Sequence, residues 1–199
     1  TGIMRIVIMA DGRGARWQGH LRTSKHLAEI NGEPLIYRTI RLLRTETQKN
    51  TEIIVTSHDK RYEFDGCKRY EPRNNVLEID RFTEELIENN MYFLYGDTYY
   101  TENAVNTILH FRPSGTTFFG NQKSIVAIWV SDSEEFKRHK NRIRQLFIDG
   151  KINECRGWQI YQSFTDQDVT APFGIKDRFI FIDDETADIN TAEDYKKLL

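Results

Sequence analysis

The chain has 199 residues, which corresponds to one domain or to one domain with a small appendage. Hydrophobic residues make up 39% and aromatic residues 12%, enough for a sizeable core and too many for a disordered chain. With 28 Lys and Arg against 30 Asp and Glu, the formal net charge is −2, which argues against a nucleic-acid partner.

Five short runs of apolar residues predict β-strands. The first run is continuous and rich in β-branched residues, as is typical of a strand buried on both faces of a parallel sheet covered by helices. The five predicted strands are Met4–Ala10, Glu52–Ser57, Tyr92–Gly96, Thr116–Phe119 and Ser124–Val130.

Amphipathic helical patterns lie between and after these strands. Pro34 suits a first helical turn, Ser133 a helix N-cap, and Gly150 a helix end. The predicted helices are residues 34–43, Val76–Asn90, Ser133–Ile148 and a last helix that starts near Thr191. The alternation predicts a three-layer α/β/α fold with a mixed, mostly parallel sheet.

Other sequence features favour a cytoplasmic protein made of one domain over residues 1–199. No apolar run approaches the roughly 20 residues of a membrane helix, and the N-terminus has no secretory pattern. The only cysteines are Cys67 and Cys155, too few for a disulfide framework or a zinc cluster. Residues 1–3 are expected to be a cloning remnant before a start at Met4.

A glycine-rich, basic loop follows the first strand. Gly12 and Gly14 allow backbone amides to face an anion, and Arg13 and Arg16 add donors for phosphate oxygens. The dinucleotide-binding and Walker patterns both fail here, because the third glycine and the Gly-Lys-Ser/Thr ending are missing. A plain turn is the alternative, but Arg16 and Lys25 at this spacing favour phosphate binding.

Three stretches together, at residues 12–17, 24–27 and 31–36, resemble the opening of nucleotidyltransferases with the GT-A-like fold. That group includes sugar-phosphate nucleotidyltransferases, phosphocholine cytidylyltransferases and the guanylyltransferases of molybdenum-cofactor synthesis. The chain departs from the usual pattern with Ser24 before the lysine and with Glu33 where a lysine is common. It also has Ala10-Asp11 where Ala-Gly is usual, which places an acidic residue close to the expected nucleotide.

Two acidic elements extend the resemblance towards the C-terminus. Asp97 follows Gly96 at the end of a predicted strand, where a turn or cap residue is the simpler interpretation and the family has a magnesium-binding aspartate. Residues 188–195 resemble the family's C-terminal Asp-x-Asp/Asn-Thr-Pro-Glu-Asp-Leu element, with Ala192 in place of proline. Asp188 is therefore expected to be the second metal ligand, with Asp183 and Asp184 as alternatives.

Several weaker signals are open to two interpretations. Asn74 and Asn75 either contact the nucleotide base or cap the following predicted helix. Trp158, Tyr161 and Phe164 either line an acceptor pocket or are core aromatics at strand spacing. The basic run at residues 137–144 is expected to be the solvated face of a helix.

The resemblance implies a Mg²⁺-dependent transfer of a nucleotidyl group from a nucleoside triphosphate to the phosphate of a small acceptor, with release of pyrophosphate. Ala10, Gly12, Arg13, Gly14, Asn74 and Asn75 would bind the nucleotide, and Arg16 and Lys25 would also act in catalysis. Asp97 and Asp188 would hold Mg²⁺. CTP is slightly preferred, from similarity to short cytidylyltransferases.

Two other functions compete with this one. The first is a GT-A-type glycosyltransferase that uses a finished nucleotide-sugar, although such enzymes usually carry a mid-chain Asp-x-Asp and lack the glycine-rich loop. The second is a non-catalytic nucleotide-binding module. Neither the acceptor nor the oligomeric state can be inferred from the residues.

Overall fold

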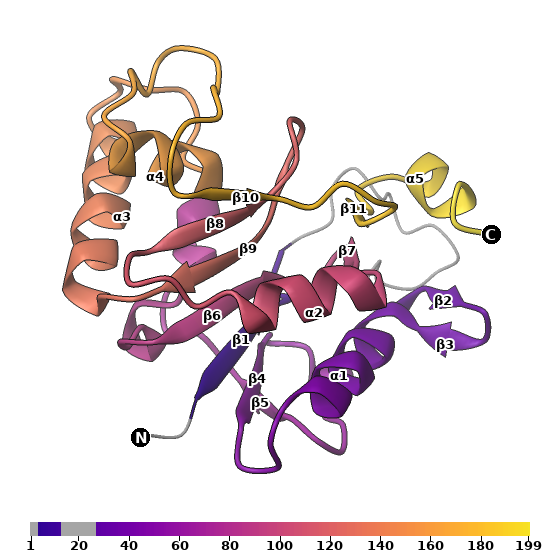
Figure 1. Ribbon diagram of the computed structural model, residues 1–199. Helices are drawn as coiled ribbons and strands as arrows, with labels where there is room; N and C mark the ends of the chain where they lie inside the picture. The colour runs from indigo at the N-terminus through magenta and orange to yellow at the C-terminus, as the bar shows by residue number, and fades with distance from the viewer. Residues whose placement is uncertain (1–3, 13–26) are drawn as a thin grey trace.

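The computed structural model describes residues 4–12 and 27–199, and its centre is a seven-stranded sheet (Figure 1). β9 runs antiparallel to both of its neighbours, and every other neighbouring pair in the sheet is parallel. In spatial order the strands are β10 (Phe179–Phe181), β8 (Thr117–Gly120), β9 (Ile125–Val130), β6 (Met91–Tyr95), β1 (Arg5–Met9), β4 (Glu52–Thr56) and β5 (Lys68–Tyr70).

Helices cover both faces of the sheet. The longer helices are α1 (Leu35–Glu46), α2 (Glu102–His110), α3 (Ser133–Ile148) and α4 (Gly157–Phe164). α1 and α2 pack on one face, and α3 and α4 pack on the other (Figure 1). The structure thereby confirms the predicted three-layer α/β fold with a mixed, mostly parallel sheet.

The central strands explain why there are two cores. Successive side chains of a strand point to opposite faces, so Ile6 and Ile8 join the core under α1 and α2 while Val7 joins the core under α3 and α4. All three side chains are fully buried. A strand with both faces covered has no polar positions, which is why the first segment is continuously apolar.

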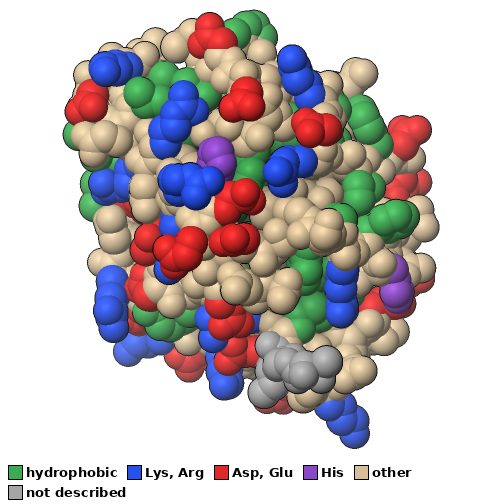
Figure 2. Space-filling model, turned by 60° about the vertical axis from the view of Figure 1, so that its left-hand side comes forward, with side chains coloured by type: hydrophobic (Ala, Val, Ile, Leu, Met, Phe, Trp, Pro, Cys, Tyr) green, Lys and Arg blue, Asp and Glu red, His purple; other side chains and the backbone are tan. Residues whose placement is uncertain are grey.

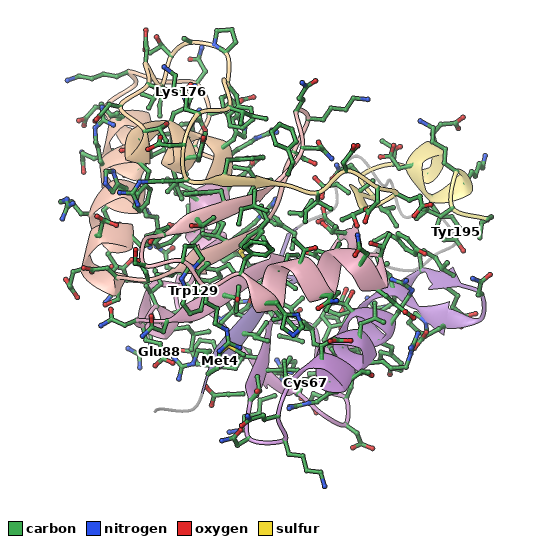
Figure 3. All side chains as sticks on the ribbon, viewed as in Figure 1. Met4, Cys67, Glu88, Trp129, Lys176 and Tyr195 are labelled. Carbon is green, nitrogen blue, oxygen red and sulfur yellow. The ribbon has the colours of Figure 1, made fainter. Side chains whose placement is uncertain are left out.

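Three further small elements lie beside the main sheet. β2 (Glu29–Ile30) pairs with β3 (Glu33–Pro34), and β7 (Thr98–Tyr99) pairs antiparallel with β11 (Ala187–Asp188). The terminal helix α5 (Ala192–Lys196) packs against the β2–β3 hairpin, where the Tyr195 hydroxyl donates to the carbonyl of Glu29 (Figure 3). Thr191 is the N-cap of α5, close to the predicted start of the last helix.

The helix predicted over Val76–Asn90 is wrong. This segment contains only two 3-10 turns, η4 (Glu78–Arg81) and η5 (Glu84–Leu86). The Asp80 carboxylate accepts hydrogen bonds from the amides of residues 76 and 77 at 3.3 and 2.9 Å, which competes with helical hydrogen bonding. Ile79, Phe82, Leu86 and Ile87 are buried all the same, whereas Val76 is exposed, so helical spacing alone was a misleading signal.

Two other expectations are corrected. The segment of Trp158, Tyr161 and Phe164 is helix α4, so the aromatic residues have helical and not strand spacing. On α3, the basic run is not all solvated, because Lys140 is only 3% exposed and pairs with Glu84. A second ion pair of the basic run joins Arg144 to Asp80. The basic face of α3 therefore anchors the non-helical segment that precedes β6.

The surface carries charges of both signs in mixture. Figure 2 shows acidic and basic side chains interspersed on the face to which α3 belongs.

None of the helices in the described ranges combines the length and apolar composition that crossing a bilayer requires. Cys67 and Cys155 are both free thiols.

Candidate active site

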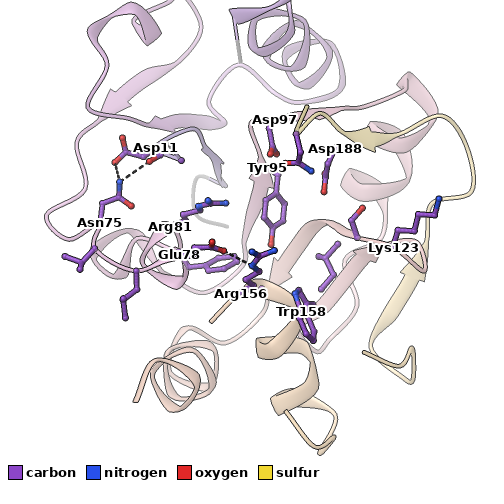
Figure 4. A pocket seen from close by; sticks show the side chains of 18 residues that line it. Asp11, Asn75, Glu78, Arg81, Tyr95, Asp97, Lys123, Arg156, Trp158 and Asp188 are labelled. Atoms are coloured by element: carbon purple, nitrogen blue, oxygen red, sulfur yellow. Dashed lines mark hydrogen bonds and ion pairs between the residues drawn. The ribbon is translucent and has the colours of Figure 1, made fainter. Parts of the chain in front are cut away.

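A pocket of about 650 Å³ opens at the carboxyl ends of the central strands (Figure 4). Asp11 and Gly12 follow β1, and Asp97 follows the neighbouring parallel strand β6. The carboxyl ends of parallel strands meet at one edge of a sheet, which is where ligands bind in open α/β folds. Residues far apart in the sequence therefore line one pocket.

Asp97 and Asp188 both line this pocket, and the β7–β11 pairing brings their segments together. Asp188 lies opposite Thr98 in the register, and the Thr98 hydroxyl donates to Asp188 Oδ1 at 2.7 Å. The amide of Ile189 donates to the carbonyl of Asp97, also at 2.7 Å. These two hydrogen bonds hold the segment that contains Asp97 against the segment that contains Asp188.

The alternative ligands Asp183 and Asp184 do not line the pocket. Asp184 instead accepts from the Thr101 hydroxyl at 2.6 Å and from the amide of Thr186 at 2.8 Å. Burial alone would raise the pKa of Asp184, but these hydrogen bonds outweigh it and hold the pKa below its usual value. In this structure Asp184 thus joins the start of α2 to the segment of Thr186.

Asp11 lies at the opposite end of the pocket, where it holds two neighbouring segments. Its carboxylate accepts from the amide of His58 at 2.9 Å and lies 2.8 Å from His58 Nδ1. The side-chain amide of Asn75 donates to the carbonyl and the carboxylate of Asp11, at 3.0 and 2.9 Å. Asn75 thus lines the pocket, whereas Asn74 lines a separate hollow beside Lys140.

Of the remaining predicted nucleotide-binding residues, Gly12 lines the pocket. Ala10 is buried directly beside it, and its amide donates to the carbonyl of Thr56 at 3.1 Å. The other predicted residues, Arg13, Gly14, Arg16 and Lys25, lie outside the described residues.

The structure adds pocket residues that the sequence did not single out. Arg81 comes from η4, Tyr95 from the end of β6, and Arg156 from the start of α4. Arg156 pairs with Glu78 at 2.8 Å across one side of the pocket (Figure 4). Only Tyr95 carried a usable signal, because it immediately precedes the Gly96-Asp97 element at a strand end.

The carboxylates of the pocket fit a magnesium ion. Within the described residues, no three acidic, histidine or cysteine side chains form a group that could hold a metal by themselves. Mg²⁺ does not need such a group, because it is usually bound by one or two carboxylates together with substrate phosphates and water. Asp97 and Asp188 both line the pocket and could supply that minimal set of ligands.

Comparison with known proteins identifies solved structures with the same fold. No protein-family model matches the chain, and no curated protein is recognisably similar in sequence. Solved structures do match over nearly the whole chain. One is CTP:phosphocholine cytidylyltransferase from Streptococcus pneumoniae, with a TM-score of 0.64, 17% identity, and coverage of 99% of this chain and 98% of that one. The chain has the nucleotidyltransferase fold.

Two further structures support the same fold. A putative glucose-1-phosphate thymidylyltransferase from Bacillus anthracis, in complex with a sucrose, has a TM-score of 0.65 and 15% identity, with coverage of 98% of this chain and 93% of that one. Rv0371c from Mycobacterium tuberculosis, in complex with manganese, has a TM-score of 0.59 and 14% identity, with coverage of 100% and 98%. The resemblance inferred from the sequence is thereby confirmed for the nucleotidyltransferase fold.

Proposed function

We propose that the protein is a nucleotidyltransferase that moves a nucleoside monophosphate from a nucleoside triphosphate to the phosphate of a small acceptor, with release of pyrophosphate. The observation that carries the proposal is that Asp97 and Asp188, from the middle and the end of the chain, line one pocket with Gly12. This pocket lies at the strand ends where the fold binds its ligands. The structural relatives include a cytidylyltransferase and a putative thymidylyltransferase.

The electrostatics of the pocket support a polyphosphate bound with a cation. Its described lining has four acidic residues, Asp11, Glu78, Asp97 and Asp188, and three basic ones, Arg81, Lys123 and Arg156. The acidic residues of this lining alone would repel a triphosphate. A Mg²⁺ ion held by Asp97 and Asp188 would offset this repulsion and stabilise the charge on the leaving pyrophosphate.

Each side chain then has a defined role. The amides of Gly12 and Gly14, with Arg13 and Arg16, would hold the β- and γ-phosphates, and Lys25 would bridge the α-phosphate and the acceptor oxyanion. An oxygen of the acceptor phosphate attacks the α-phosphorus, and the bond from that phosphorus to the pyrophosphate oxygen breaks. No general base is needed, because the acceptor phosphate is already ionised at neutral pH. Positioning and electrostatic stabilisation therefore carry the rate.

The test is a screen of CTP, UTP, ATP, GTP and dTTP with Mg²⁺, read first as an increase in melting temperature. The nucleotide that binds is then incubated with phosphocholine and with sugar 1-phosphates, and pyrophosphate is measured. We expect CTP to stand out and pyrophosphate to appear with one acceptor. Release of a nucleoside diphosphate from a nucleotide-sugar would favour a glycosyltransferase, and binding without turnover would favour a non-catalytic module.

Matched substitutions test the residue roles. Asp97→Ala and Asp188→Asn should lower kcat by at least about 10²–10³, as should Lys25→Ala, because each removes a group that offsets or organises charge in the transition state. Asp183→Asn should leave kcat unchanged, since Asp183 lies outside the pocket lining. Wild-type turnover by Asp97→Ala at saturating nucleotide and Mg²⁺ would show that the metal assignment is wrong.

A further inference from the structure

We propose that the guanidinium of Arg81 and the hydroxyl of Tyr95 form an additional oxyanion site in this pocket, which binds a phosphate group of the reactants. The inference rests on the proposed function and deepens it, because it names two binding residues beyond the glycine-rich loop and the acidic elements. Both side chains line the pocket and are partly buried.

Arg81 lies directly against the start of the glycine-rich loop. A Cβ atom added at Gly12 would be 3.3 Å from Arg81 Nη2 and 3.4 Å from its Cζ, so the guanidinium packs on the bare backbone of that glycine. In Figure 4 the Arg81 side chain extends towards the middle of the pocket, between the Asp11–Asn75 pair and the two metal-site aspartates. A phosphate bound there would contact the backbone at Gly12 and Arg81 together.

The charge of Arg81 is available to a ligand. The other pocket arginine, Arg156, is paired with Glu78 at 2.8 Å. No carboxylate of the described residues lies within ion-pair distance of Arg81, and none of them exchanges a hydrogen bond with its guanidinium. A guanidinium carries five N–H donors in a planar fork that matches phosphate oxygens. Arg81 is thus a partly buried cation whose donors face the cavity.

Tyr95 supplies a neutral donor in the same pocket. Its ring ends against Gly157, where an added Cβ would overlap the Tyr95 hydroxyl, so the hydroxyl is held close to the first turn of α4. A phenolic hydroxyl can donate a hydrogen bond to a phosphate oxygen.

The phosphate could belong to the nucleoside triphosphate or to the acceptor, because the same oxyanion chemistry applies to both. In either case, Arg81 would offset negative charge next to the Asp97–Asp188 wall, where two anionic reactants must approach one another. Binding measurements on each reactant separate the two sources.

The experiment compares wild type with Arg81→Gln, Arg81→Lys and Tyr95→Phe. Arg73→Gln is the matched control, because Arg73 belongs to the same chain segment but its side chain is 84% exposed and outside the pocket lining. Circular dichroism and melting temperature verify that each variant is folded. Calorimetry gives Kd for the nucleoside triphosphate and for inorganic tripolyphosphate with Mg²⁺, and steady-state kinetics gives kcat and the acceptor KM.

We expect Arg81→Gln to weaken binding of the reactant whose phosphate occupies the site at least tenfold. Tyr95→Phe should weaken the same binding about threefold or more, and Arg81→Lys should retain part of the affinity that Arg81→Gln loses. A raised Kd for the nucleotide assigns the site to the nucleotide, whereas a raised acceptor KM alone assigns it to the acceptor. If wild type turns over but Arg81→Gln matches it in both Kd and KM, the oxyanion site is refuted and the proposed function stands. If tripolyphosphate binding depends on Arg81 but no acceptor is ever converted, the site stands and the proposed reaction does not.

Discussion

Asp11 occupies a position where the related pattern has a small residue, and its carboxylate organises one end of the pocket. It holds the Asn75 side-chain amide through Nδ2, which turns Asn75 Oδ1 away from Asp11 (Figure 4). That oxygen can only accept hydrogen bonds. If this end of the pocket receives the base, a fixed acceptor favours bases that present an amino group, such as cytosine.

Asp11→Asn should therefore reduce base discrimination. An asparagine at position 11 can present a donor to Asn75, so the Asn75 amide is no longer held in one orientation. We expect the ratio of the Kd values for UTP and CTP to fall about tenfold towards unity, which corresponds to the net value of one or two hydrogen bonds. Calorimetry on both nucleotides measures the ratio, with Asp65→Asn, an exposed site outside the pocket, as control. An unchanged ratio in a folded variant would exclude Asp11 from base selection.

At the scale of an element, the first turn of α4 depends on a glycine. The helix starts at Gly157, which is buried where Tyr95 and Phe82 approach its backbone. A Cβ there would be 3.1 Å from Phe82 Cζ and would overlap the Tyr95 hydroxyl. Both rings are packed in the core under α3 and α4, so neither can move freely.

Gly157→Ala should lower the free energy of unfolding by about 1–3 kcal/mol, the usual cost of overpacking. The double variant Gly157→Ala with Tyr95→Phe should cost less than the sum of the two single changes, because the overlapping hydroxyl is gone. Urea denaturation of the four proteins in this cycle measures the coupling. Strict additivity would mean that the clash is relieved by movement of α4 and not at Tyr95.

At the scale of the whole molecule, a buried ion pair joins the segment before β6 to α3. Asp80 is 5% exposed, accepts from Arg144 Nε at 2.8 Å, and also holds the amides of residues 76 and 77. Burial would raise the pKa of Asp80, but Arg144 and the two amides outweigh it and hold the pKa below its usual value. This network keeps η4, and with it Arg81 and Glu78, on the wall of the pocket.

The Asp80 network makes stability depend on pH in the acid range. Because the folded pKa is below the unfolded one, the contribution is complete above about pH 4 and is lost as the pH falls through the folded value. Asp80→Asn should cost about 1–3 kcal/mol near neutral pH. Its unfolding free energy should also decrease less steeply than that of wild type between about pH 4 and pH 2. Denaturation curves over this range measure both effects, and parallel pH profiles would contradict the assignment.

Local patterns in the sequence were sufficient to predict several of the strands and helices. The strands Arg5–Met9, Glu52–Thr56 and Ile125–Val130 were predicted almost to the residue, because burial on both faces leaves a continuous apolar run. The α3 and α5 helices were predicted from polar and charged residues at their starts, although the N-cap of α3 is Asp132, whose carboxylate accepts from the amide of Glu135, and not the predicted Ser133. The strand prediction also placed Asp97 at the carboxyl edge of the sheet, but only the family resemblance indicated a metal ligand there.

Contacts between distant parts of the chain decided the rest. The segment after Asn75 is not helical because Asp80 has partners on its own backbone and on Arg144, 64 residues later, and no periodicity reveals such a partner. Asp188, rather than Asp183 or Asp184, lines the pocket because the β7–β11 register sets it opposite Thr98. Arg81 and Tyr95 line one pocket only after the sheet has ordered its strands. The sequence alone determined which segments are buried, because burial follows from local hydrophobicity. Only tertiary packing decided which polar side chains share the cavity.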